Sequence, residues 1–195
     1  VSLIDLAPTL LKEAGADPIN NLPGRALQPL LKGESTQWRN HLFTEFHIHS
    51  AHNYYPQRTV QNQRYKLILN LMPGKVNPGY EFTNNRFFEY LTDTINGAEE
   101  PIRSAYLNME RPVKYELYDL QEDPFEFTNL ASDPKHAKKL ESLQKRLQTW
   151  RENTKDPMLN PQNVFRLKEE IDACFVDGQP NKAKLILTYP DYFFK

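Results

Sequence analysis

The strongest constraint on the fold is a strand, an acidic turn and a long amphipathic helix that follow one another in the second half of the chain. Tyr115 to Leu120 alternates as a strand does, and Asp123-Pro124 is typical of a tight turn. Asp133 then caps a helix whose first position is Pro134, where a missing N–H matters little. The apolar residues of this helix recur at helical spacing: Leu140, Leu143, Leu147 and Trp150. Asp156-Pro157 ends the helix, and its apolar stripe predicts packing on one face of a sheet.

Three further segments are predicted strands or hairpins. His41 to His49 alternates, Arg58 to Asn70 is a hairpin that turns near Asn62-Gln63, and Lys182 to Thr188 is a possible last strand. Together with the strand at Tyr115 they predict an α+β fold, a small antiparallel sheet of about four strands packed by the long C-terminal helix. Shorter helices are expected at Arg86 to Asn96, Ile102 to Met109 and Gln162 to Cys174.

The chain opens on another helix pattern. Asp5 is placed to cap it, Pro8 falls in the first turn, and Gly15 fits the stop. Its apolar stripe consists of Leu6, Leu10, Leu11 and Ala14. A chain that begins directly on a half-buried helix is expected to be part of a longer protein.

Composition excludes several classes of protein. The formal net charge of −1 gives no reason to expect a nucleic-acid partner. No apolar run approaches the roughly 20 residues that cross a bilayer, so no membrane partner is expected. The single cysteine, Cys174, rules out an internal disulfide and a cysteine-rich zinc site.

Three segments together resemble the C-terminal region of sulfatases. The first is Val1 to Leu11 with the Gly24-Arg25 loop, which is similar to a "D-L-x-P-T-L-L" run. The second is the Arg58 to Ile68 hairpin, which is similar to "R-x-V-x-x-x-R-Y-K-L-I". The third is Tyr115 to Asp156, with its "E-L-Y-D-L" strand. The match covers roughly two-thirds of the chain in the right order, so it is more specific than any one motif.

Within the sulfatases the chain is most similar to the heparan N-sulfatase branch. The residues that carry this likeness are His49, the Tyr55-Pro56-Gln57-Arg58 turn, Asn70-Leu71, Trp150 and Asp156-Pro157. The resemblance implies a sulfuric ester or sulfamate hydrolase of the alkaline-phosphatase-like α/β superfamily that acts on sulfated sugars of heparan type. It implies that residues 1–40 are the tail end of the catalytic domain and that residues 41–195 are a C-terminal subdomain that shapes the substrate pocket.

The resemblance also implies cofactors that this chain is not expected to hold. Sulfatases use a formylglycine, made from a Cys or Ser in a Cys/Ser-x-Pro/Ala-x-Arg motif, beside a calcium ion. Cys174 lies in Asp172-Ala173-Cys174-Phe175-Val176, which does not match that motif, and no serine matches it either. No catalytic residue and no metal ligand is therefore assigned here, and the chain alone is expected to be inactive without its N-terminal catalytic domain.

The location implied by the family is periplasmic or exported in bacteria, or lysosomal in animals. The chain contains no Asn-x-Ser/Thr sequon, which animal lysosomal and secreted hydrolases usually carry, so a bacterial source is favoured.

A polar cluster supplies the candidate substrate-binding residues His49, His47, Glu45 and Arg58. His41, Glu45, His47 and His49 share one strand face by period two, and imidazole and guanidinium groups donate hydrogen bonds to sulfate. Two alternatives stay open for the histidines, a solvated strand face and a zinc site that uses His47 and His49. Arg58 has its own alternative, in which it locks the turn by binding backbone carbonyls.

Two rival functions also remain. One is a non-catalytic module that binds glycans or supports a partner chain. The other keeps the superfamily but changes the leaving group, as in a phosphatase or phosphonate hydrolase. Exposure of Leu6, Leu10 and Leu11 on the first helix would favour the enzyme fragment, because it would mark a surface that another domain covers.

Overall fold

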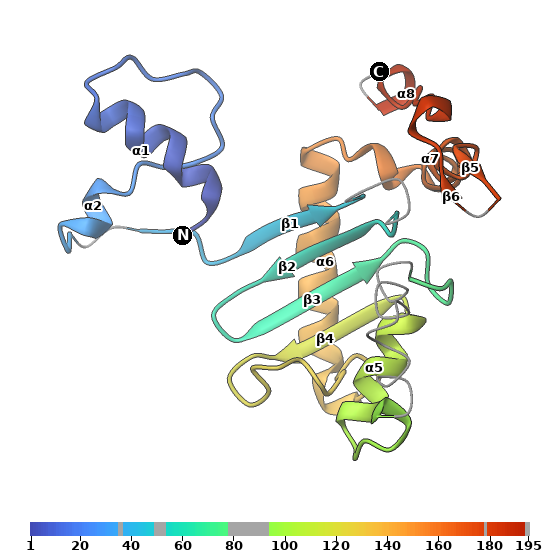
Figure 1. Cartoon of the computed structure of the whole chain (residues 1–195). Helices are drawn as coiled ribbons and strands as arrows, with labels where there is room; N and C mark the ends of the chain where they lie inside the picture. The colour runs from blue at the N-terminus through green and yellow to red at the C-terminus, as the bar shows by residue number, and fades with distance from the viewer. Residues whose placement is uncertain (35–36, 49–53, 78–93, 178, 194–195) are drawn as a thin grey trace. The chain divides into compact units, whose positions relative to one another are not determined.

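A computed structural model describes residues 1–34, 37–48, 54–77, 94–177 and 179–193. The chain divides into two compact units, Val1–Leu42 and Phe43–Lys195, called unit 1 and unit 2 below (Figure 1). The division falls close to the boundary expected after residue 40. The assignment of unit 1 to a catalytic domain stays a prediction.

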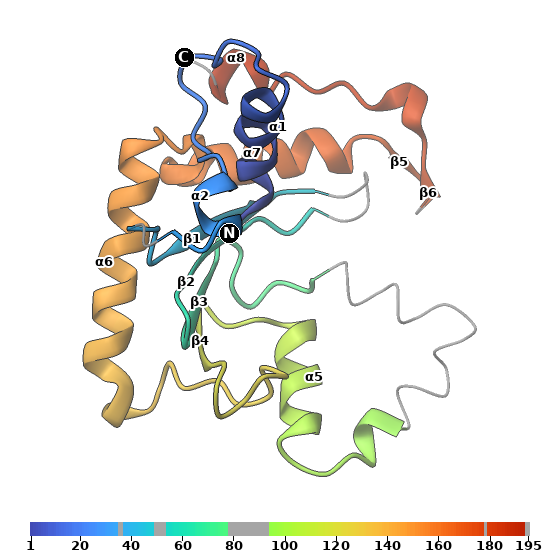
Figure 2. The ribbon, with the colours of Figure 1, turned by 90° about the vertical axis from the view of Figure 1, so that its left-hand side faces the viewer.

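Unit 2 is built on a four-stranded antiparallel sheet in the order β1-β2-β3-β4. The strands are β1 (Leu42–Phe46), β2 (Gln57–Gln61), β3 (Tyr65–Asn70) and β4 (Tyr115–Asp119). Figure 2 shows the sheet edge-on, with the long helix α6 (Ala137–Asn153) on one face and α5 (Ile102–Glu110) on the other. The predicted α+β layers are confirmed.

The hairpin turns where the sequence places it. The side-chain oxygen of Asn62 accepts hydrogen bonds from the backbone N–H groups of Arg64 (2.9 Å) and Tyr65 (2.7 Å), which closes the turn between β2 and β3. The register pairs Val60 with Leu67 and Leu67 with Leu117, so these three apolar side chains share one sheet face.

Helix α6 covers that apolar face. Leu143 and Leu147 lie at most 2% exposed and pack against Val60, Leu67 and Leu117. The carboxylate of Asp133 accepts a hydrogen bond from the N–H of Lys135 (2.9 Å) and so caps a 3-10 turn, Pro134–His136, that leads into α6 at Ala137. The predicted Asp133 cap and Pro134 start are confirmed for this turn.

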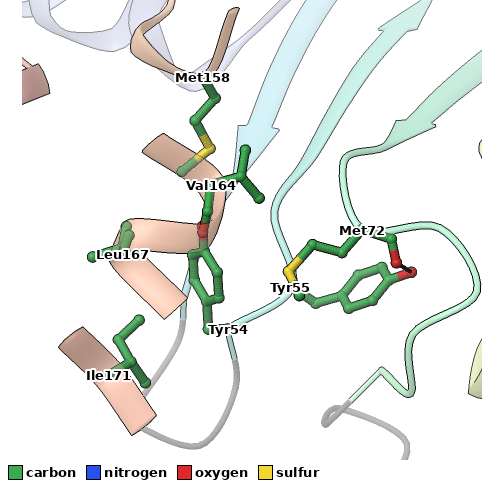
Figure 3. Close-up of a cluster of buried hydrophobic side chains, with 7 residues drawn as sticks. All are labelled: Tyr54, Tyr55, Met72, Met158, Val164, Leu167 and Ile171. Atoms are coloured by element: carbon green, nitrogen blue, oxygen red, sulfur yellow. Dashed lines mark hydrogen bonds between the residues drawn. The ribbon is translucent and has the colours of Figure 1, made fainter. Parts of the chain in front are cut away.

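A second apolar cluster lies beside the first, where α7 (Pro161–Asp172) packs against the turn that leads into β2. Tyr54 donates a hydrogen bond from its hydroxyl to the carbonyl of Val164 (2.8 Å), and Tyr55 donates one to the carbonyl of Met72 (2.9 Å). Figure 3 shows the two tyrosines with the α7 side chains Leu167 and Ile171. Each ring is therefore buried with its polar end satisfied, which fixes the backbone just before β2.

The last part of the chain differs from the prediction. Lys182–Lys184 is a short 3-10 helix and the residues up to Thr188 form no strand, so the predicted strand at 182–188 is wrong. The next regular element after this segment is the short helix α8 (Pro190–Phe193). The remaining strands are a two-residue pair, β5 (Phe175–Val176) and β6 (Gln179–Pro180). The helix expected at Arg86 to Asn96 lies largely outside the described residues.

Unit 1 contains a short 3-10 helix (Leu3–Asp5), α1 (Leu6–Glu13) and α2 (Gln28–Leu31). The position of Asp5 predicts that it caps α1, but its side chain forms no capping hydrogen bond to that helix. Its buried carboxylate instead receives two hydrogen bonds of 2.6 Å from Arg39, one of 2.9 Å from the N–H of Arg25 and one of 2.8 Å from the N–H of Ser2. The hydrogen bonds from Arg39, which outweigh the effect of burial, lower the pKa of Asp5 to about 2.

Steric contact with the backbone of Ile4 requires a glycine at position 24. A β-carbon at this position would lie 1.8 Å from the carbonyl oxygen of Ile4, so no larger residue fits without moving the backbone. The loop that carries Gly24 therefore packs directly on the start of α1. Among the described segments no helix is both long enough and apolar enough to span a bilayer.

Candidate substrate-facing site

Three of the predicted site residues meet where β1 ends and β2 begins. Oε2 of Glu45 lies 3.6 Å from Nε of Arg58 and 3.8 Å from Nε2 of His47. The side chain of Glu45 is 53% exposed, whereas that of Arg58 is fully buried. The fourth residue, His49, and its neighbour His52 lie outside the described residues. The site therefore presents one accessible carboxylate held beside one imidazole.

Arg58 is bound on all three of its nitrogens. Nε and Nη2 donate to the two carboxylate oxygens of Asp156 at 2.9 and 2.7 Å, and Nη1 donates to the carbonyl of Gln57 at 2.9 Å. This bidentate geometry is the strongest form of Arg–carboxylate contact. Of the two alternatives for Arg58, the geometry favours the structural one, in which the guanidinium locks the start of β2.

Asp156 is the centre of this network. It also accepts a hydrogen bond of 2.7 Å from Nε of Arg151 and one of 3.0 Å from the N–H of Met158. Burial opposes its charge, but the hydrogen bonds from Arg58 and Arg151 outweigh that effect and hold the pKa of Asp156 below its usual value. One carboxylate thus ties β2, the end of α6 and the next turn together beneath Glu45.

The surroundings of His47 disfavour the charged form of its imidazole. Burial, and then the charge of Arg58, lower its pKa from the ordinary 6.5, although Glu45 and Asp156 act in the opposite direction. Its ring meets that of Phe193 edge-on, with centroids 6.1 Å apart. Its Nε2 is buried and has no hydrogen-bond partner among the described residues. The part of the ring that is accessible, 27% of the side chain, therefore does not include Nε2.

We expect acidification to destabilise unit 2 through His47. Because its folded pKa is lowered, the unfolded chain binds the proton more tightly, so stability is full above about 6.5 and declines as the pH falls below that value. Thermal unfolding at pH 7 and pH 5 checks this. The fall in midpoint between the two pH values should be smaller in His47→Gln than in the wild type, and equal falls would contradict the assignment.

The opposite face of the sheet carries a second polar network that the sequence analysis missed. The buried carboxylate of Glu116 receives hydrogen bonds from Asn70 (2.5 Å), Asn108 (2.9 Å) and the hydroxyl of Tyr118 (2.5 Å). Burial and then the neighbouring Glu116 raise the pKa of Tyr118. Gln57 joins the two networks, since its side chain donates to Asn70 (2.6 Å) and its carbonyl accepts from Arg58.

A cavity of about 430 Å³ lies over this second network, between the sheet and α5. Its polar lining includes Gln57, Asn108 and Glu116, and its apolar lining includes Met109 and Phe127. The alternation of β4 is the signal that could have found it. If Leu117 faces α6, Glu116 and Tyr118 must point to the other side.

The described residues do not form a metal or formylglycine site. No three His, Cys, Asp or Glu side chains come together in a metal-binding group within the described ranges. Cys174 is fully buried beside α7, and its surrounding sequence does not fit the formylglycine motif. No reaction step is therefore assigned to a group held by this chain.

Comparisons with known proteins place the chain. The family described as N-sulphoglucosamine sulphohydrolase, C-terminal, matches residues 1–83, which include β1 and β2. Human N-sulphoglucosamine sulphohydrolase is 32% identical over 80% of this chain and 33% of its own length. An ulvan-active sulfatase of Formosa agariphila is 28% identical over 96% of this chain and 38% of its own length.

A solved structure agrees with these relatives. A 2-O GAG sulfatase superposes with a TM-score of 0.53 at 26% identity, over 78% of this chain and 25% of that one. The chain thus spans about a third of the length of the curated relatives that it matches. It belongs to the sulfatase family, in which it corresponds to the C-terminal region and resembles that of N-sulphoglucosamine sulphohydrolase.

Proposed function

We propose that this chain is the substrate-shaping C-terminal part of a hydrolase that removes sulfate from esters or sulfamates of heparan-type sugars. The observation that carries the proposal is the pairing of Glu45 and His47 above a buried Arg58–Asp156 ion pair. Relatives that act on differently named substrates share this region, so the sulfated-sugar class is better supported than any one sugar.

The chemistry of Glu45 limits what it can bind. A carboxylate repels sulfate but accepts hydrogen bonds from sugar hydroxyl or amino groups. The side chain of His47 is 27% exposed with its Nε2 buried, so its ring offers a packing surface beside that carboxylate. The two side chains are therefore suited to orient the sugar ring rather than to hold its sulfate. The buried network beneath them keeps Glu45 in place without using an exposed cation.

Unit 1, as the tail end of the proposed catalytic domain, carries a surface that the rest of that domain would cover. No residue of α1 is buried, and Leu6 and Leu10 are 48% and 67% exposed. Leu3, just before α1, is 83% exposed. So many exposed aliphatic side chains on one short segment are typical of a surface that packs against another part of the protein. This favours an enzyme fragment over a self-contained module.

The intact enzyme would supply the rest of the chemistry. Its formylglycine would provide the nucleophile that attacks sulfur, and its calcium ion would neutralise sulfate charge. The sequence holds no formylglycine motif, and the described residues hold no metal-binding group, so we assign both to the proposed N-terminal catalytic domain. An exported or lysosomal location follows from the same proposal.

The proposal is tested by the variant Glu45→Gln in the intact enzyme. Loss of one charge-assisted hydrogen bond is expected to raise KM for an N-sulfated glucosamine substrate about tenfold. Glu122→Gln, which removes one exposed charge from the turn after β4, is the matched control and should change KM less than about twofold.

Two results would overturn the proposal. If the intact enzyme releases no sulfate from any sulfated sugar, the hydrolase assignment fails. If it does release sulfate but Glu45→Gln behaves as Glu122→Gln does, the role of the β1 end in substrate binding fails while the hydrolase assignment stands.

A further inference from the structure

A groove lies between the edge strand β1 and α6 in unit 2. It has a volume of about 530 Å³. Its apolar floor is formed by Phe43 and Trp150, whose rings stack with centroids 5.2 Å apart and planes 5° from parallel. Its remaining lining is polar or basic: Ser142, Lys145, Arg146, Thr149 and Asn153.

The charge along the groove has one sign. Lys145 and Arg146 are exposed, and neither forms an ion pair with any described residue. Neither glutamate of α6 lines the groove. Glu141 lines a neighbouring hollow that it shares with Tyr115 and Lys145, and Glu152 accepts a hydrogen bond from Gln148 (2.8 Å). The groove is thus basic although the whole chain is close to neutral.

This combination fits an anionic carbohydrate better than the alternatives. A half-buried aromatic floor offers a flat face to the C–H groups of a sugar ring. Hydroxyl and amide side chains beside it match sugar hydroxyls, and Lys145 and Arg146 match sulfate or carboxylate groups. A solvated helix face explains the cations alone, but it does not explain their position beside a stacked pair of aromatic rings.

We propose that this groove binds a segment of a sulfated polysaccharide. The inference rests on the proposed function, because it takes the same substrate class. It extends that function by giving the chain a carbohydrate-binding surface built from α6 and β1, with Lys145 and Arg146 recognising the anionic groups and Phe43 with Trp150 supporting the sugar ring.

The test is binding of a heparin octasaccharide by the chain, measured by isothermal titration calorimetry at 50 and 150 mM NaCl. The variant Lys145→Gln/Arg146→Gln should weaken binding at least about tenfold, which corresponds to about 1.4 kcal/mol, and should reduce the salt dependence. The control Lys32→Gln/Arg103→Gln removes the same charge from exposed positions elsewhere and should weaken binding less than about twofold.

A third variant tests the floor of the groove. Trp150→Leu should weaken octasaccharide binding more than the control Lys32→Gln/Arg103→Gln does. The unfolding midpoint of Trp150→Leu is measured alongside, so that loss of folding is not mistaken for loss of binding. Binding of a fully desulfated octasaccharide should be lost in the wild type.

Several results would overturn the inference. Absence of octasaccharide binding by the wild type would do so, and so would equal weakening of binding in the two double variants. Equal binding of the sulfated and desulfated octasaccharides would also contradict it. So would a dimer, detected by light scattering, that the variant Trp150→Leu dissociates. Sulfate release by the intact wild-type enzyme is measured separately. A sulfatase without groove binding would refute the groove alone, and groove binding without sulfate release would refute the hydrolase proposal alone.

Discussion

The variant Asp156→Ala is expected to lower the free energy of unfolding of the chain by about 3–5 kcal/mol. Its carboxylate is the anion that neutralises two cations, Arg58 with a fully buried side chain and Arg151 with a side chain 8% exposed. Removing it takes the buried counter-charge from both guanidinium groups, and only the half-exposed carboxylate of Glu45, 3.6 Å from Nε of Arg58, remains beside Arg58. The N–H of Met158 also loses its acceptor. Urea unfolding, followed by circular dichroism, measures the change.

Two companion variants make the result specific. Arg58→Met should cost less than Asp156→Ala, because Arg151 still pairs with Asp156 and the methionine fills part of the space. Asp172→Ala removes an exposed partner of Lys168 and should cost less than about 1 kcal/mol. If Asp156→Ala is no worse than Asp172→Ala, the network does not hold β2 in place, and the structural role of Arg58 is wrong.

The same residues show how far the sequence alone predicts the fold. Asp133 and Pro134 begin the 3-10 turn that leads into α6, and they act within a few residues of one another, so the local pattern was sufficient. The hairpin was predictable for the same reason, since Asn62 closes its own turn. The strand expected at 182–188 was wrong because the periodicity of a short apolar run does not distinguish a strand from other structures. Nothing adjacent in the sequence, such as a cap or a turn motif, resolves that choice.

The candidate site was less predictable, because its partners are distant in sequence. Arg58 and Asp156 are 98 residues apart, and Asp156 alone suggested only a helix stop. One signal was present. By period two, Arg58 shares a strand face with Val60, whose apolar side chain points to the core. That placement indicated a buried arginine with a carboxylate partner, and it argued against a guanidinium that reaches substrate.

Glu45 and His47 illustrate the opposite case. Alternation along the expected strand from His41 to His49 predicts their proximity. In the structure β1 ends at Phe46, so His47 lies just beyond the strand, with its Nε2 3.8 Å from Oε2 of Glu45. The local sequence does not predict that the imidazole is buried, because the ring it packs against, that of Phe193, comes from the far end of the chain. The position of His47 beyond β1 and the lowered pKa of its ring therefore both depend on the fold.

The second large effect is expected for Leu147→Ala in α6. Leu147 is 1% exposed and belongs to the cluster formed with Val60, Leu67, Leu117 and Leu143, so its removal leaves a cavity between α6 and the sheet. Substitutions of this kind lower stability by about 2–5 kcal/mol, and alanine favours a helix at least as well as leucine, so the loss reports packing and not helix propensity. The midpoint of urea unfolding measures it, with the slope unchanged.

Leu107→Ala in α5 is the matched control, since this leucine is 44% exposed, and it should cost less than about 1 kcal/mol. Leu147→Met, which keeps most of the side-chain volume, should recover most of the lost stability. Equal losses in Leu147→Ala and Leu107→Ala would mean that α6 is not packed on the sheet as described. In that case the groove between α6 and β1 would also lose its structural basis, because Trp150 and Arg146 are positioned by the same helix.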